Sequence, residues 1–330
     1  MSYNTASDPS THSTALASVS FVLPALNECE HIERSVASIQ QHGKSWVREL
    51  IVVDNGSIDG TPEIAAKAGA TVIHFPEGTV AAARNRGVVE CAGDVLVFLD
   101  ADVSLTSEWE TAFPAVLDSL TRTPQQVTGS RCAPEARNDF LTRYWFARLT
   151  HTEARYVNSG HLVTTRALFD AIGGFDAERE TAEDYDFCMR ASAAGALIKN
   201  QENLRAVHHD YPSTLSAFVA REAWHGRDDF KDASSLGASR IGLIVCLNLV
   251  LLVLCLIVAL AISSLVPLLL YVIFAATLLI GLTIAKFGRS SLNELLGTSV
   301  VFAVYLCGRT LSLLQMFRER VLASKSRLSK

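Results

Sequence analysis

Apolar and polar residues alternate in a regular rhythm over the first part of the chain. From Val19 onward, short apolar runs rich in β-branched residues predict strands, and the amphipathic stretches between them predict helices. The predicted strands are Val19–Leu23, Leu50–Val53, Thr71–Phe75 and Val95–Leu99, and the predicted helices are Glu30–Gln41, Gly60–Ala68 and Val80–Cys91. This alternation is typical of an α/β fold with a mostly parallel, Rossmann-like sheet, in which ligands bind at the carboxyl ends of the strands.

Beyond residue 125 the rhythm loosens, although further elements are predicted. Gly173 and Gly174 stop one of the helices, because paired glycines favour a turn. The predicted strands are Gln126–Gly129 and His161–Thr165, and the predicted helices are Asp139–Thr150, Arg166–Ala171, Glu183–Ala194 and Ser213–Phe230.

A much longer apolar stretch follows these elements. From Ile241 to Ala285 the chain contains no Asp, Glu, Lys, Arg or His. About 20 apolar residues cross a hydrocarbon core, so this stretch is long enough for two spans. It predicts a C-terminal transmembrane helical hairpin with helices over residues 241–262 and 265–285. Basic residues flank the hairpin at both ends, which predicts that both ends lie in the cytoplasm.

A third apolar stretch, residues 295–316, is interrupted by Arg309 and has two interpretations. It is either a helix lying in the membrane interface or a third span. A third span would place the basic tail, residues 317–330, outside, whereas cytoplasmic segments carry the excess of Lys and Arg. We therefore prefer the interfacial helix.

The formal charge of the chain changes sign near residue 240, where the long apolar stretch begins. Residues 240–330 hold nine Lys or Arg against two Asp or Glu, a formal charge of +7, and the remainder carries −12. An acidic soluble part argues against nucleic acid as a partner, because neutralising phosphates needs a basic face. A basic C-terminal region beside apolar helices favours contact with anionic membrane lipids.

Two further features concern the redox state of the compartment and the N-terminal segment of the chain. The seven cysteines are scattered and include no C-x-x-C pair, so neither a disulfide framework nor a structural zinc site is expected. Residues 1–17 are rich in Ser and Thr and lack an apolar core, which predicts a disordered leader and no signal peptide.

Candidate chemistry follows the predicted strands. Asp100 and Asp102 come directly after Val95–Leu99, and residues two apart on extended backbone point to the same side. Two such carboxylates suit a hard divalent cation when a substrate diphosphate supplies the other oxygens. Asp54 follows another strand, where a carboxylate can accept hydrogen bonds from a base or a ribose. Arg84 can contact phosphate, or pair with Asp54 or Asp100.

Five motifs occur in one order along the chain. They are Ser20-Phe-Val-Leu-Pro-Ala-Leu-Asn-Glu28, Val53-Asp-Asn-Gly-Ser-Ile-Asp-Gly-Thr61, Ala83-Arg-Asn-Arg-Gly87, Asp100-Ala-Asp102, and Gly173-Gly-Phe-Asp176 followed by Glu183-Asp184. Together they resemble glycosyltransferase family 2, whose inverting GT-A enzymes use nucleotide-diphosphate sugars. The resemblance covers about residues 18–232 and implies a GT-A catalytic domain there, with a membrane region over residues 233–330.

The resemblance implies roles on the donor side. The nucleoside pocket would be lined by Pro24, Ala25, Asn27 and Glu28, with Asp54 holding the base and Arg84 steadying the nucleotide. Asp102 would bind Mg²⁺ or Mn²⁺ directly, and Asp100 would reach the ribose or a metal-bound water. His208, which resembles the family's histidine before the final helix, would complete the metal site or contact the diphosphate.

The resemblance also implies roles on the acceptor side. Glu183-Asp184 matches the family's acidic pair, and Asp184 would be the catalytic base that takes the proton of the acceptor hydroxyl. Both acids would equally suit the start of any helix, where the macrodipole favours negative charge. The acceptor side would be shaped by Gly174, Phe175, Asp176, Trp224 and Arg227.

The sequence thus predicts a membrane-anchored, inverting and non-processive glycosyltransferase. It would move one sugar from a nucleotide-diphosphate sugar, UDP being favoured by family prevalence, to a lipid-linked or glycan acceptor on the cytoplasmic face. The Gln-x-x-Arg-Trp motif of processive synthases is absent. Two alternatives are a catalytically inactive homologue that acts as a membrane scaffold and a sugar nucleotidyltransferase. The second would need a Gly-rich, Arg-containing loop after the first strand, where this chain has Pro-Ala-Leu-Asn-Glu.

Overall fold

The computed structural model describes residues 18–152 and 156–328; the predicted leader lies outside this part of the chain. The strands are β1 (Val19–Ala25), β2 (Val47–Asp54), β3 (Thr71–His74), β4 (Val95–Leu99), β5 (Val103–Leu105), β6 (Gln126–Gly129), β7 (Ala133–Pro134), β8 (His161–Thr165), β9 (Leu197–Asn200) and β10 (Ala206–His208). The helices of the same region are α1 (Ile32–His42), α2 (Thr61–Lys67), α3 (Val80–Val89), α4 (Ser107–Arg122), η1 (Thr142–Phe146), α5 (Ala147–Leu149), α6 (Arg166–Ala171), α7 (Glu183–Ala193), α8 (Leu215–His225) and η2 (Asp228–Phe230). They are followed by α9 (Ala233–Ala238), α10 (Arg240–Ala261), α11 (Val266–Phe287) and α12 (Leu292–Leu328).

Seven strands form one sheet in the order β3-β2-β1-β4-β8-β6-β9. Strand β8 runs antiparallel to both of its neighbours, whereas the other neighbouring pairs are parallel. Ala25 of β1 pairs with Asp54 of β2, so these two strands end level with each other. A second, three-stranded sheet in the order β5-β10-β7 stands beside the carboxyl end of β4. The mixed α/β fold with a mostly parallel sheet is the predicted one.

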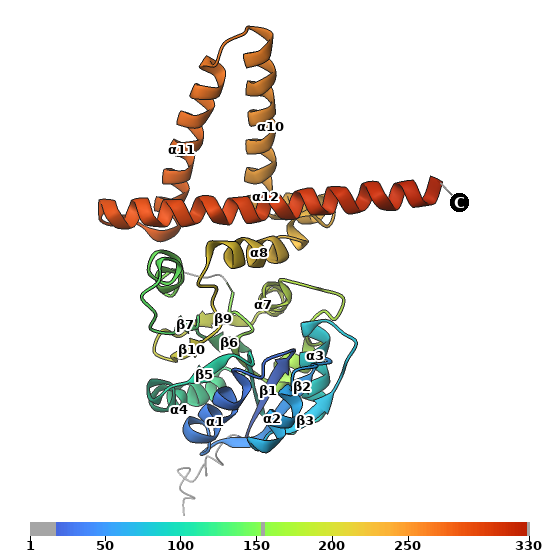
Figure 1. Ribbon diagram of the computed structural model, residues 1–330. Coiled ribbons are helices and arrows are strands. Elements are labelled where there is room, and N and C mark those ends of the chain that lie inside the picture. Colours follow the sequence, from blue (N-terminus) through green and yellow to red (C-terminus); the bar gives the residue numbers. More distant parts are fainter. Residues whose placement is uncertain (1–17, 153–155, 329–330) are drawn as a thin grey trace, which may run out of the picture.

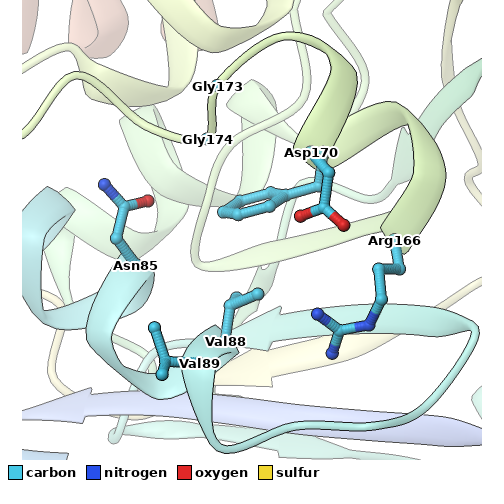
Figure 2. Close-up of a pocket in the computed structure, with 8 residues that line it drawn as sticks. Asn85, Val88, Val89, Arg166, Asp170, Gly173 and Gly174 are labelled. Atoms are coloured by element: carbon cyan, nitrogen blue, oxygen red, sulfur yellow. The ribbon is translucent and has the colours of Figure 1, made fainter.

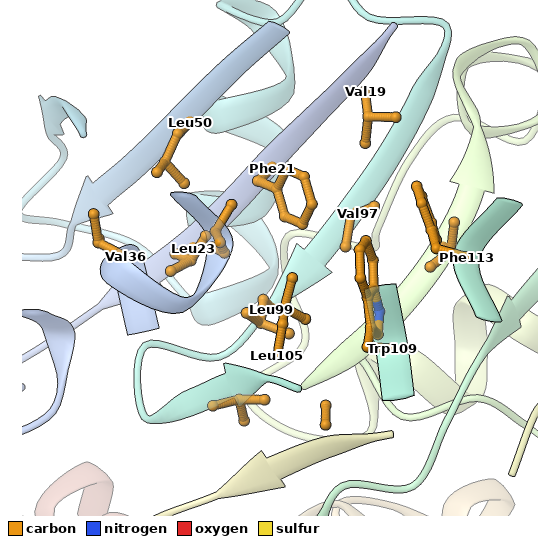
Figure 3. Close-up of a cluster of buried hydrophobic side chains, with 14 of the residues drawn as sticks. Val19, Phe21, Leu23, Val36, Leu50, Val97, Leu99, Leu105, Trp109 and Phe113 are labelled. Carbon is orange, nitrogen blue, oxygen red and sulfur yellow. The ribbon is translucent and has the colours of Figure 1, made fainter. Parts of the chain in front are cut away.

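Both faces of the large sheet are buried. Phe21 and Leu23 of β1 point toward the face that α1 and α4 cover, where Trp109 stacks on Phe113 with ring centroids 4.1 Å apart (Figure 3). The alternate residue Val22 belongs to a second cluster on the other face. Burial on both faces explains why the central strands read as continuous apolar runs in the sequence. The burial of the strands also determines the position along the sheet at which they end and the polar loops begin.

Most of the predicted elements are confirmed, and two need correction. The strands Gln126–Gly129 and His161–Thr165 have the predicted bounds. The helix predicted over 139–150 is wound as the π-helix η1 and then α5, with the Asp139 carboxylate accepting the Thr142 amide at 2.8 Å. The helix predicted over 213–230 is broken at Gly226, because α12 passes so close that a Cβ there would lie 3.0 Å from the Cβ of Ser312.

The C-terminal helices differ in how they meet the α/β domain. Helices α10 and α11 form a hairpin that projects from it, and α12 lies across the base of that hairpin, next to α8 (Figure 1). Within the described residues, three helices are long and apolar enough to cross a membrane: Arg240–Ala261, Val266–Phe287 and Leu292–Leu322. The third is the least apolar of them.

Candidate active site

Strand β4 carries two carboxylates to the edge of the sheet. Asp100 follows its last residue, and Asp102 immediately precedes β5. Strand β10 pairs antiparallel with β5 and places His208 opposite Val103. As a result, ligand atoms of Asp100, Asp102 and His208 all lie within 4.8 Å of one another. The fold therefore brings the three predicted metal ligands to one point.

This cluster holds more negative charge than its surroundings neutralise. Asp102 is 7% exposed, and its burial, followed by the charges of Asp100 and Glu28, raises its pKa to about 8. Burial and then the charges of Asp210 and Asp100 raise the pKa of Glu28 to about 7. Carboxylate oxygens and one imidazole nitrogen are ligands that Mg²⁺ or Mn²⁺ accepts. A divalent cation therefore fits the residues present, because it would offset this crowding.

The histidine of the cluster is buried in a form suited to ligation. Nδ1 of His208 lies 3.1 Å from a carboxylate oxygen of Asp102, yet it makes no hydrogen bond of acceptable geometry with the described residues. Its ring stacks on Tyr211 with centroids 4.0 Å apart. Burial, followed by the charge of Arg221, lowers the pKa of His208 to about 3. The imidazole is therefore neutral, which is the form that binds metals.

The loops after β1 and β2 are pinned to each other beside these acids. The backbone amide of Asn27 donates to the Ser57 hydroxyl at 2.9 Å, and the backbone amide of Glu28 donates to the Thr61 hydroxyl at 2.7 Å. Asn27 has a left-handed backbone, φ 56°, which asparagine tolerates better than most residues. Pro24 and Ala25 end the adjoining strand. All four residues predicted for the nucleoside pocket thus lie at one edge with Asp54.

Asp54 is fully buried and held by two donors. Its carboxylate accepts from the Ser57 amide at 3.1 Å and pairs with Nδ1 of His74 at 2.8 Å. Burial opposes ionisation, but these hydrogen bonds outweigh it and lower the pKa of Asp54. The His74 side chain is 67% exposed. Because Asp54 itself has no exposed surface, a base at this edge would meet its partner His74, a residue that the sequence did not single out.

Arg84 lies beneath the site and joins its two acid groups. Its guanidinium is 2.7 Å from Asp100 and 2.8 Å from Glu183, and the residue is 2% exposed. Burial lowers the pKa of Arg84, but the charges of Asp100 and Glu183 raise it further, so that the net shift is upward. The pairing with Asp100 considered from the sequence is confirmed. Because the guanidinium is buried, any effect on a nucleotide would be exerted through Asp100.

Glu183 and Asp184 are the first two residues of α7. The Ser159 hydroxyl donates to Glu183 at 2.8 Å, and the Tyr185 amide donates to Asp184 at 2.7 Å. Burial and then the charge of Glu183 raise the pKa of Asp184 to about 7, although Arg84 opposes the shift. A carboxyl group that titrates near neutrality is matched to general acid–base catalysis. The geometry thus separates a paired acid, Glu183, from one without a cation of its own.

A family comparison covers this region. Residues 20–179 match the model described as glycosyl transferase family 2. The match contains β1 to β4, the loops that follow them, and Arg84. This domain belongs to glycosyltransferase family 2.

Two curated relatives of the family-2 domain align over most of it. The pre-mycofactocin glycosyltransferase of Mycobacterium tuberculosis (strain CDC 1551 / Oshkosh) is 30% identical over 224 residues, which are 63% of this chain and 46% of the relative. The succinoglycan biosynthesis protein ExoA of Rhizobium meliloti (strain 1021) is 26% identical over 213 residues, 60% of this chain and 64% of the relative. The chain thus spans about half the length of the first relative.

A solved structure shares the fold. The mannosyltransferase PcManGT from Pyrobaculum calidifontis, in complex with GDP-Man and Mn²⁺, superposes with a TM-score of 0.61 over 91% of this chain and 88% of that one. The two sequences are 18% identical over the superposition, so the likeness concerns the fold alone.

The residues predicted for the acceptor side of the family-2 domain are not equally exposed. Gly174 has φ 70°, and a Cβ there would lie 2.8 Å from the Asn85 side chain. Phe175 is buried against Phe98, with ring centroids 5.0 Å apart, so it lies in the core and not on an acceptor surface. Asp176 is exposed and pairs with Arg179 at 3.4 Å. Of the three, Asp176 is the one whose side chain can meet an acceptor directly.

The end of α8 is tied to the loop that precedes Glu183. Arg227 lies 3.4 Å from Glu180, and the Thr181 hydroxyl donates to Asp228 at 2.9 Å. Trp224 is 41% exposed at the same end of α8. This link places the predicted acceptor residues Trp224 and Arg227 next to the segment that leads into the acidic pair Glu183-Asp184.

Two site residues that the sequence did not reveal precede β8. Ser159 holds Glu183, and a Cβ on Gly160 would lie 2.6 Å from a carboxylate oxygen of Asp100. Because β8 runs antiparallel, its first residues lie at the edge where the parallel strands end. A small polar pair before an antiparallel strand was therefore the signal that could have identified them.

A separate hollow of about 400 Å³ opens between α3 and α6 (Figure 2). Arg166 and Asp170 stand on one side of it, and Asn85 stands on the other. None of its lining residues belongs to the acid clusters described above. The two acid clusters thus lie elsewhere on the domain.

Proposed function

We propose that this protein is an inverting glycosyltransferase that moves one sugar from a nucleotide-diphosphate sugar to a lipid-linked or glycan acceptor. The observation that carries the proposal is the meeting of two acid groups at one sheet edge, joined by Arg84. The intact acids weigh against an inactive scaffold. The first relative named above is a pre-mycofactocin glycosyltransferase, which supports the same class of reaction.

The donor would lie along the carboxyl ends of β1, β2 and β4. Pro24, Ala25, Asn27 and Glu28 would line its nucleoside side, and His74, held by the buried Asp54, would face the base. The metal ligands would be Asp102, Asp100 and His208, and Mg²⁺ or Mn²⁺ bound there would neutralise the diphosphate. PcManGT in complex with GDP-Man and Mn²⁺ supports this class of donor. We favour UDP on family prevalence.

Asp184 would act as the general base. The acceptor hydroxyl oxygen attacks the anomeric carbon from the face opposite the diphosphate, while the Asp184 carboxylate takes the hydroxyl proton. The new carbon–oxygen bond forms as the bond to the diphosphate breaks, so the nucleoside diphosphate leaves and the configuration inverts. Contacts from Ser159 and Tyr185 would hold the acidic pair in place during this step.

The membrane arrangement follows from the apolar hairpin. We propose that α10 and α11 span the cytoplasmic membrane and leave the catalytic domain on the cytoplasmic side. Arg240 flanks the start of α10, and Lys286 and Arg289 flank the end of α11, as the positive-inside rule expects. An acceptor carried by a membrane lipid would thereby be held close to the domain.

Nucleotide binding by the full-length protein in detergent tests this proposal. UDP or GDP should raise the melting temperature in the presence of Mn²⁺ but not in its absence. Asp102→Asn should abolish the shift, whereas Asp118→Asn, on the exposed face of α4, should retain it. If no nucleoside diphosphate stabilises the wild-type protein with Mn²⁺, the proposed function is wrong.

A further inference from the structure

Helix α12 is longer than a span requires and is bound to the soluble domain along one face. Its 37 residues extend about 55 Å at 1.5 Å per residue, compared with a hydrocarbon core of about 30 Å. The helix lies across the base of the hairpin and packs on α8, and its C-terminal part runs on past the hairpin (Figure 1). Its orientation thus differs from that of α10 and α11.

Arg309, near the middle of α12, anchors this packing. Its guanidinium lies 3.2 Å from the Glu222 carboxylate in α8 and 3.1 Å from the Asp229 carboxylate in η2. A Cβ on Gly308 would come within 2.7 Å of the Cβ of Glu222. Further along, the Arg320 guanidinium donates to the Phe230 carbonyl at 2.9 Å. Because the contact is close and its charges are paired, α8 and α12 hold one relative position.

The other face of α12 is apolar and exposed. Exposed apolar residues recur at helical intervals along it: Leu292, Leu296, Val300, Leu311, Leu314, Phe317, Val321 and Leu322. At 3.6 residues per turn, Phe317 and Arg309 point in clearly different directions. The charged and small residues of α12 therefore face the catalytic domain. Its apolar side chains face the side from which the hairpin projects.

We propose that α12 lies in the plane of the membrane, at the boundary between lipid headgroups and acyl chains. If α12 instead crossed the bilayer, α8 would follow it, and Arg309, Glu222 and Asp229 would lie in hydrocarbon, where charged side chains are costly. An in-plane position keeps these three charges on the aqueous side and buries the apolar face. Arg318 points in the same direction as Val300 on that face, so its long side chain would extend to the phosphates, and the basic C-terminal region matches an anionic leaflet.

This position would also set the height of the active site. Through Asp228 and Thr181, the α8–η2 corner that Arg309 holds is joined to the loop before Glu183. The in-plane helix would thereby keep the acceptor side of the domain at the lipid surface. This consequence rests on the proposed function, whereas the position of α12 does not.

Reporter fusions to the otherwise intact chain test the topology without using activity. Green fluorescent protein and alkaline phosphatase are fused after Lys330, with fusions after Ser264 and after Arg289 as references for the two sides. The Lys330 fusion should behave like the Arg289 fusion, because an in-plane helix returns the chain to the same side. If it behaves like the Ser264 fusion, α12 crosses the membrane and the proposal is overturned.

Lipid contact is tested by photo-crosslinking of the full-length protein in phosphatidylglycerol–phosphatidylcholine vesicles. Benzoylphenylalanine replaces Phe317 on the apolar face or, as the matched control, Glu319 on the opposite side of the same turn, and both positions are exposed. Lipid adducts should form severalfold more at position 317 than at position 319. Equal yields, or no adduct at 317, would show that this face does not lie on lipid.

Discussion

Two acid pairs at the same sheet edge have similar composition but different electrostatic surroundings. Asp100 and Asp102 face Glu28 and a neutral histidine, and the pKa of Asp102 rises to about 8 through burial and these like charges. In the other pair, Glu183 is 2.8 Å from the Arg84 guanidinium, and among the described residues no cation forms an ion pair with its neighbour Asp184.

The difference separates the tasks that the two pairs can perform. A group of buried acids with too little positive charge favours an external cation, because the cation restores the balance. Both pairs share the Arg84 cation, so they differ in their other neighbours. Glu28 and His208 crowd Asp102, whereas burial and the charge of Glu183 raise the pKa of Asp184, which can take up and release a proton. Arg84 spans both pairs, since its second nitrogen lies 2.7 Å from Asp100.

Replacing Asp102 with Asn should produce the largest effect. Metal-dependent nucleotide binding should be lost, and transfer should fall by about 10³-fold or more, because a cation at the leaving diphosphate contributes several kcal/mol. Titration calorimetry with UDP and Mn²⁺ measures the first effect, and the rate of donor turnover measures the second. In metal-free buffer the melting temperature should not fall, since a neutral amide relieves the crowding of acids. A large loss of metal-free stability would show that Asp102 has a structural role instead.

Replacing Asp184 with Asn should give the contrasting result. Transfer should fall by between about 10² and 10⁴, the usual contribution of a general base. Calorimetry should show unchanged affinity for UDP with Mn²⁺, because Asp184 lies outside the metal cluster. Asp186→Asn, two residues along the same helix, should leave transfer unchanged. An equal loss of nucleotide affinity in the Asp102 and Asp184 variants would remove the distinction between the two pairs.

The larger part of the fold could be predicted from the sequence because burial leaves a local pattern. Strand β4 is buried at every position, so it appears as an uninterrupted apolar run followed by Asp100. Strands β5, β7 and β10 have two or three residues each and leave no such pattern. The break at Gly226 depends on α12, which is remote in the sequence, so local periodicity could not reveal it.

The candidate residues of the site could be named from the sequence, but the contacts that join them could not. Asp100, Asp102 and Asp184 could be identified from position and motif. The Arg84–Glu183 ion pair joins residues 99 positions apart, and His74 meets Asp54 only because β3 pairs with β2. Such contacts are set by tertiary packing. For the same reason the sequence suggested that Arg84 could contact phosphate directly, whereas the structure buries it.

Replacing Arg84 with Met tests the link between the two pairs. Removing one partner of a buried ion pair costs about 3–5 kcal/mol, because the remaining charges stay buried without compensation. Arg86→Met, on the same helix, is the matched control. Its partner Glu90 lies 2.8 Å away, but both side chains are substantially exposed, so the cost should be about 0.5 kcal/mol. Chemical denaturation of the full-length variants in detergent measures both, and similar losses would contradict the bridging role of Arg84.

A pH series isolates Asp184 without removing any contact from the wild-type protein. Its raised pKa, about 7, means that the folded protein holds this proton up to neutrality, whereas an unfolded chain releases it near pH 4. Transfer should therefore rise with pH and level off above about 7, because the base must be ionised. The free energy of unfolding should change in the opposite sense. The stabilisation contributed by the protonated Asp184 carboxyl group is fully present below about pH 4 and is lost as the pH rises through 7. Relative to Asp184→Asn, the wild type should thus lose up to about 1.4 kcal/mol per pH unit over this window. A stability difference that stays constant between pH 5 and 8 would mean that Asp184 is already ionised, which would leave the acidic pair without a group that titrates near neutrality.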